Sequence, residues 1–156
     1  MERLELIRDF VNTWDADDGS DVVEPWLAEH GLRVGARDAV RVREAIRDLL
    51  LANNGVAVDV EAASRVLAAA ARRARLRVEF ADGEARVHGT GGLGALLAAL
   101  AEAMRSEEWQ RLKACRADTC RWAFVDHARN RSRAWCSMSV CGNRQKAQRF
   151  RERHAA

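Results

Sequence analysis

The sequence is poor in the residues that interrupt helices or crosslink chains, because only one of its 156 residues is proline and four are cysteine. No apolar run approaches the ~18 residues that a membrane-spanning helix needs, which excludes a helical membrane protein. The N-terminus lacks the basic start, apolar stretch and small-residue cleavage site of a secretory signal. We therefore expect a cytoplasmic protein with no membrane partner.

What the sequence does contain is typical of a globular, mainly helical protein, with 48% hydrophobic and 31% charged residues and an abundance of Ala, Leu and Arg. A chain of this length can form one ordinary core, or a small core plus a module that something other than burial stabilises. We expect the second arrangement.

Apolar residues at three- and four-residue spacings predict helices over 4–14, 38–52 and 59–75, and a further helix after residue 92. A shorter helix should follow the capping pair Ser20-Asp21, with Pro25 in its first turn. The last of these helices should bury Leu93, Leu96, Leu97, Leu100 and Met104.

Residues 76–80 and 85–88 alternate between apolar and polar around Asp82-Gly83, a dipeptide suited to a tight hairpin turn. An isolated hairpin is marginal in water. We therefore expect these strands to lie on the helices or to extend another sheet.

All four cysteines fall in the last third of the chain, as Cys115 and Cys120 followed by Cys136 and Cys141. Two C-x4-C pairs in a reducing compartment favour a metal site over disulfides or four unrelated buried thiols. Four thiolates around Zn²⁺ form a closed tetrahedral site with no position for a catalytic water, so the predicted cofactor is a structural zinc ion.

The residues between and after the pairs predict the shape of this module. Residues 122–125 should form one arm of a hairpin that turns near 130–132 and returns over 133–135, and a helix should run from 137 to 153. This order is that of a treble clef. The predicted fold class is α+β, with a mainly helical domain and its β-hairpin at 1–108 and a treble-clef-like four-cysteine zinc finger at 109–156.

Charge is segregated along the chain. From Arg111 onward twelve Lys or Arg stand against three acids, a balance of +9, whereas residues 1–110 carry −6. This pattern indicates a basic interaction module, with DNA as the expected partner and an RNA or protein partner, or a merely solvated surface, as alternatives. The candidate nucleic-acid-binding residues are Arg129, Arg131, Arg133, Arg144, Lys146, Arg149, Arg151 and Arg153.

The apolar residues of this module fall into two groups. Val140, Ala147 and Phe150 should form an inward stripe on the final helix. Trp122, Phe124 and Trp135 could stack on unpaired bases, but beside a zinc site we favour a small core.

The residues Cys141-Gly142-Asn143-Arg144, with Arg133-Ala134-Trp135-Cys136 before them, closely resemble the CGNR zinc-finger family, a bacterial group named for this tetrapeptide. The segment 115–126 and the residues 129–132 share in this likeness. Phe10-Val11-Asn12-Thr13 resembles the start of the ABATE-type domain that usually precedes the finger, although this N-terminal region is short. The resemblance implies a stress-associated, DNA-binding transcriptional regulator.

Three weaker signals complete the sequence analysis. A small-molecule effector could bind a pocket formed by Asn12, Trp14, Arg43 and Arg47, with the arginines holding an anion. The pattern G-x-G-x-x-G at 89–94 lacks the βαβ context of a dinucleotide loop. His127 would suit a nuclease only beside a second metal site, for which the sequence offers no ligands, so we do not expect an enzyme. The sequence does not indicate an oligomeric state.

Overall fold

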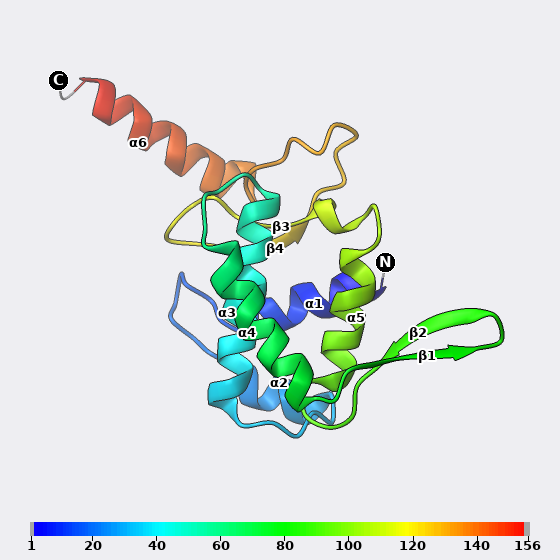
Figure 1. Ribbon diagram of the computed structural model, residues 1–156. Coiled ribbons are helices and arrows are strands. Elements are labelled where there is room, and N and C mark those ends of the chain that lie inside the picture. Colours follow the sequence, from blue (N-terminus) through cyan, green and yellow to red (C-terminus); the bar gives the residue numbers. More distant parts are fainter. Residues whose placement is uncertain (1, 155–156) are drawn as a thin grey trace.

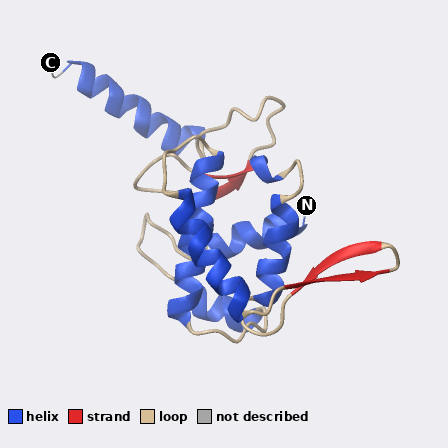
Figure 2. Cartoon of the chain, viewed as in Figure 1, coloured by secondary structure: helices blue, strands red, loops and turns tan. Residues whose placement is uncertain are grey.

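The computed structural model describes residues 2–154, with the backbone alone for Arg149, and shows a helical body from which two elements project (Figures 1 and 2). None of the described helices is long and apolar enough to cross a membrane. In chain order the elements are α1 (Glu2–Val11), α2 (Val23–Glu29), α3 (Ala36–Asn53), α4 (Val60–Arg73), β1 (Arg77–Ala81), β2 (Glu84–His88), α5 (Gly94–Met104), the 3₁₀ turn η1 (Trp109–Arg111), β3 (Leu112–Ala114), β4 (Ala123–Val125), the π-helical turn η2 (Met138–Gly142) and α6 (Asn143–His154).

The helical body follows the predicted apolar periodicity, and the five helices expected before residue 105 are confirmed. The side chains of Phe10, Ile46, Leu50 and Leu96 meet in the core with almost no exposed surface. Asp59 caps the start of α4, because its Oδ1 accepts the N–H of Ala62, whereas α2 has Val22 at its cap position and Asp21 Oδ1 only accepts the N–H of Val23. Met104 was expected to be buried, but 43% of its surface is exposed at the end of α5.

The same core continues into the cysteine-bearing segment. Trp109, Leu112, Ala114 and Ala123 are buried within the cluster that also contains the helical side chains. The helical part and the cysteine-bearing part of the chain therefore share apolar packing at Trp109 and Leu112. Unfolding of either part exposes apolar surface of the other.

The hairpin of β1 and β2 differs from the prediction in its position. The turn forms at Asp82 and Gly83, with φ of 53° and 76°, and joins strands paired from Arg77 with His88 to Ala81 with Glu84. However, the hairpin is a separate two-stranded sheet that projects from the helices (Figure 2), and Phe80 is 83% exposed. The expectation that it would extend another sheet is therefore wrong, and only β2 lies beside a helix, α5, so the hairpin as a whole does not lie on the helices.

Close packing explains part of the glycine pattern at 89–94. A Cβ on Gly89 would lie 2.6 Å from the Cα of Gly94, so the backbones of these two residues touch. Glycine at both positions lets the chain pass from β2 into α5, which accounts for the pattern without a bound dinucleotide.

Candidate metal centre and basic surface

The four cysteines come from three short segments that the fold brings together. Cys115 follows β3 and Cys120 precedes β4, so the first pair lies in the turn between these two strands. This turn is closed by hydrogen bonds from the N–H of Cys115 to the carbonyl of Trp122 and from the N–H of Cys120 to the carbonyl of Ala117. Cys136 lies just before η2, and Cys141 lies within it.

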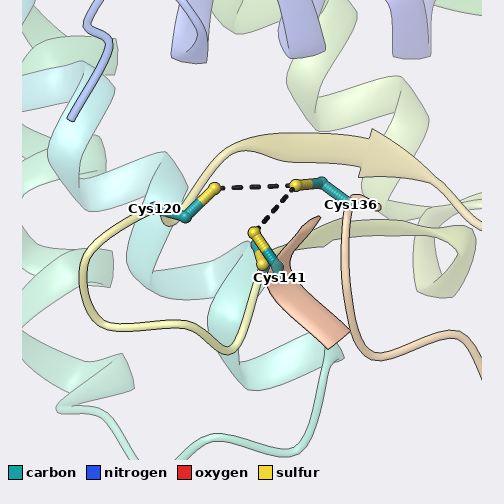
Figure 3. Close-up of side chains that lie close together, drawn as sticks. Cys120, Cys136 and Cys141 are labelled. Carbon is teal, nitrogen blue, oxygen red and sulfur yellow. Dashed lines mark hydrogen bonds between the residues drawn. The ribbon is translucent and has the colours of Figure 1, made fainter. Parts of the chain in front are cut away.

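The cysteine sulfur atoms are arranged as a tetrahedral metal ion requires. All four Sγ atoms lie within 4.8 Å of one another, and Figure 3 shows the side chains of Cys120, Cys136 and Cys141 converging. The Sγ of Cys136 is 3.5 Å from that of Cys120 and 3.7 Å from that of Cys141. Four Zn–S bonds of ~2.3 Å at tetrahedral angles place the sulfurs about 3.8 Å apart, so the cluster fits one zinc ion.

The protonation of the cluster makes metal binding depend on pH. None of the four cysteines is in a disulfide. A hydrogen bond from the Cys120 thiol lowers the pKa of Cys115 to about 5, whereas the same pairing raises the pKa of Cys120. Burial raises the pKa of Cys136 to about 12. Without a metal the thiols of Cys120 and Cys136 stay protonated at neutral pH, so metal binding must release protons and weakens as the pH falls.

The strand pairing in this segment differs from the prediction. β4 pairs with β3, in register from Leu112 with Val125 to Ala114 with Ala123, and residues 133–135 form no strand. The predicted arm at 122–125 is therefore real, but its partner precedes the first cysteine pair instead of following it. In place of a paired return strand, side-chain hydrogen bonds of Lys113 and Asp126 hold the segment after β4.

Lys113 and Asp126 form a buried ion pair that holds the loop 126–133. Lys113 Nζ lies 2.8 Å from Asp126 Oδ2 and also donates to the carbonyls of Arg131 and Arg133. Asp126 in turn accepts the backbone N–H groups of Ala128 and Arg133. Burial alone would raise the pKa of Asp126, but these hydrogen bonds outweigh it and hold that pKa below its usual value.

We expect Asp126→Asn to lower the free energy of unfolding by about 3–5 kcal/mol, because it leaves the Lys113 ammonium buried without its counter-charge. The depressed pKa means that the stabilisation by Asp126 is complete above the unfolded-state pKa of about 3.9 and is lost as the pH falls through the folded-state value. Urea denaturation of both proteins should give a constant difference between about pH 5 and 7 and a smaller one below about pH 4. A difference that changed between about pH 5 and 7 would contradict this assignment.

Three asparagines of the helical body bind the backbone of the cysteine-bearing segment. Asn12 exchanges two hydrogen bonds with the backbone of Ala123, at 3.0 and 2.7 Å. The Asn53 side-chain amide donates to the carbonyls of Trp109 and Leu112. The Asn54 side-chain amide donates to those of Ala114 and Ala134. The body thus fixes the turn that carries Cys115 and the segment that leads to Cys136.

The end of α3 adds a further contact to this docking. Arg116 Nε donates to the carbonyl of Asn54 at 2.6 Å, and a Cβ on Gly55 would lie 3.0 Å from the Arg116 guanidinium. Gly55 also has a φ of +75°. The sequence analysis predicted only a helix that ends at 52, and no local pattern signals that the residues after it also hold a segment 62 residues away.

The final helix α6 projects from the body into solvent (Figure 1). Arg144, Lys146, Arg151 and Arg153 are exposed on it, and the side chain of Arg149 lies outside the described residues. Val140 is 49% and Phe150 56% exposed, so the predicted inward stripe of Val140, Ala147 and Phe150 is wrong. The helix is anchored at its N-terminal end through η2 instead.

The predicted basic residues differ in their exposure and in the contacts that their side chains make. Arg129 and Arg131 are exposed on the loop 126–133. The Arg133 guanidinium donates to the carbonyls of Trp135 and Cys136 and lies 4.9 Å from the centre of the Phe124 ring, so it contributes to the module itself. Arg144 reaches Asp17 and Thr119 at 3.5 Å, both weak exposed contacts.

The candidate effector residues are mostly engaged in packing. Arg43 is buried and bonds Asp21, Glu44 and Thr13 through its guanidinium. Arg47 is also buried, donates to the carbonyl of Val11 and lies 5.1 Å from the centre of the Trp14 ring. Its Nε and Nη1 have no hydrogen bond among the described residues, and burial lowers its pKa.

Asn12 instead lines an open cleft between α1, α2 and the cysteine-bearing segment. The cleft measures about 610 Å³ and is also lined by Trp26, Trp122, His127 and Cys136. Trp14, Arg43 and Arg47 do not line this cleft, so the four predicted residues do not meet around it.

The aromatic residues of the module pack on the cysteines. Phe124 is buried with Cys115, Cys120 and Cys141, and Trp122 and Trp135 are half-buried against the same cluster. This placement agrees with the small-core interpretation. Among the described residues, the four cysteines are the one group of His, Cys, Asp or Glu side chains that could hold a metal ion.

Comparison with known proteins finds a match to a part of the chain. No curated protein matches the chain. The segment of residues 111–154, which contains the four clustered cysteines and α6, matches the family model of the CGNR zinc finger, a zinc-binding module.

Proposed function

We propose that this protein binds duplex DNA through a zinc-stabilised module and acts as a transcriptional regulator. Cys115, Cys120, Cys136 and Cys141 hold one Zn²⁺, whose chemical contribution is structural because four thiolates complete its coordination. The order of a cysteine-bearing turn, an extended segment and a helix that begins at the last cysteine supports a treble-clef-like assignment. The zinc fixes the base of α6 relative to the loop 126–133.

The observation that carries this proposal is the exposed, basic helix α6, which leaves the body at the metal centre (Figure 1). A helix that projects in this way has the width to enter a major groove. Arginine side chains along it can bind phosphates, or guanine edges with two hydrogen bonds each. The exposed Arg129 and Arg131 lie on a second basic element of the same module.

The proposal includes stress-associated regulation and an ABATE-type role for the N-terminal body. Its basis is the resemblance at residues 10–13. In this scheme the body senses an effector and the module binds DNA. The cleft that adjoins Asn12 and Cys136 lies between these two parts, so a ligand there would contact both.

A titration of the full chain with duplex DNA, single-stranded DNA and structured RNA tests the proposal by fluorescence anisotropy. We expect tightest binding to the duplex, because the exposed charges are on a helix while Phe124 is buried and the module's tryptophans are half-buried. Preference for single strands would instead favour an RNA-binding module. No binding to any nucleic acid at low salt would leave a protein-interaction role and refute the proposal.

A further inference from the structure

The β1–β2 hairpin has an apolar face that is left exposed. In an antiparallel pair, residues opposite each other point to the same side, so Val78 and Val87 share a face with Phe80 and Ala85. Val78 is 55% and Phe80 83% exposed, and Ala85 is exposed as well. The hairpin lies at the far end of the molecule from α6 (Figure 1). Its apolar face therefore plays no part in the metal centre or the basic surface.

The backbone of β1 has unpaired groups on its outer edge. Ala81 and Glu84 flank a two-residue turn and form its closing pair. Because bonded pairs alternate along an antiparallel ladder, Ala81, Glu79 and Arg77 bond β2, and the N–H and C=O groups of Val78 and Phe80 point outward. No described residue outside the hairpin bonds these groups.

This edge is only partly protected against strand pairing. Exposed edges are commonly blocked by proline, charged side chains, a bulge or a covering element, and of these β1 has only the charges of Arg77 and Glu79. β1 reads Arg-Val-Glu-Phe-Ala, its register with β2 is uninterrupted, and it projects clear of the helices (Figure 2). Since a two-stranded hairpin is marginal in water, addition of further strands would stabilise it.

We propose that two copies of this chain associate through antiparallel pairing of their β1 strands, giving one four-stranded sheet. A two-fold axis at Glu79 places Val78 of each copy opposite Phe80 of the other, so every outward backbone group of one strand meets an outward group of its partner. The apolar faces of both hairpins become continuous. Other registers that keep the two apolar faces on the same side pair fewer of the outward N–H and C=O groups.

The charges of the hairpin are compatible with this arrangement. Arg77 and Arg86 balance Glu79 and Glu84, so the strands of the two hairpins carry no net charge, and each Arg77 lies diagonal to Glu79 of the other copy. The one unfavourable contact is between the two Glu79 carboxylates, each of which lies 3.4 Å from His88 of its own strand pair. Four added backbone hydrogen bonds outweigh one like-charged pair.

Sedimentation velocity of the full chain over a wide range of concentrations tests this inference. The chain should form a concentration-dependent dimer that Val78→Pro or Phe80→Lys abolishes. Proline at position 78 removes an outward N–H and leaves the bonds to β2 intact, so the hairpin itself should persist. Val60→Lys, which changes an exposed valine on α4, is the matched control and should leave the dimer unchanged.

Glu79→Gln makes the test specific, because it removes the like-charged contact. We expect the dimer dissociation constant to fall about two- to five-fold in this variant. A chain that stays monomeric up to its solubility limit, or a dimer that persists in both Val78→Pro and Phe80→Lys, would overturn the inference. These readouts are independent of DNA binding.

Discussion

Replacing Cys115 by serine is expected to unfold residues 109–154 and to destabilise the helical body with them. Structural zinc contributes about 10–16 kcal/mol of apparent binding free energy in small fingers, whereas whole domains are stable by about 5–15 kcal/mol. A short module stabilised by so small a cluster of apolar side chains cannot replace that contribution. Trp109, Leu112 and Ala114 would then be lost from the shared core.

Thermal unfolding followed by tryptophan fluorescence measures this effect, because three of the five tryptophans are Trp109, Trp122 and Trp135. A loss of at least about 5 kcal/mol corresponds to a fall in Tm of about 10–20 °C for a chain of this size. A strong chelator should lower the Tm of the unaltered protein to the same value and leave the variant unchanged. Thr119→Ser, an exposed change in the same turn, is the control. An unchanged Tm in Cys115→Ser would refute the structural role.

Reversing the charge of Arg144 and Arg151 on α6 is expected to weaken duplex DNA binding at low salt by at least about 100-fold. Each charged hydrogen bond contributes about 1.5–3 kcal/mol, and about 1.4 kcal/mol corresponds to a factor of ten. If each arginine contacts one phosphate, the slope of log affinity against log salt should also become shallower by about 1.8. Anisotropy titrations over a salt series measure both quantities.

A matched control separates the loss of a direct contact between α6 and DNA from the effect of a changed net charge. Arg41→Glu with Arg72→Glu alters the net charge equally, but places the new acids on exposed positions of α3 and α4. The control should lose far less affinity than the α6 variant. Equal losses in both proteins would mean that α6 is not the binding element.

Apolar periodicity sufficed to predict the helices, since on α3 Val42, Ile46 and Leu50 repeat at the spacing that one buried helix face requires. The convergence of the four cysteines was also predictable, because two C-x4-C pairs, read on the expectation of a reducing compartment, favour a shared metal site. Both are patterns of residue type and spacing that can be recognised without knowing which distant residues they contact.

The features that sequence reasoning missed depend on long-range contacts. Asn12 binds Ala123 across 111 residues, and although the sequence singled out Asn12, no local pattern indicates that its partner is the cysteine-bearing segment. Likewise, the sequence allows β4 to pair with a strand before the first cysteine pair or with one after it. The observed partner is β3, which precedes that pair, and the buried contact between Lys113 and Asp126 accompanies this pairing. The inward stripe on α6 failed because its apolar residues point to solvent where the helix leaves the body.

The central claim is that four sulfurs bind one zinc ion, and zinc-edge X-ray absorption on the purified full chain tests it most directly. The predicted result is one zinc per chain with four sulfur neighbours at ~2.3 Å. A spectrum that requires nitrogen or oxygen in place of any of these sulfurs, or a folded protein without bound metal, would contradict the account.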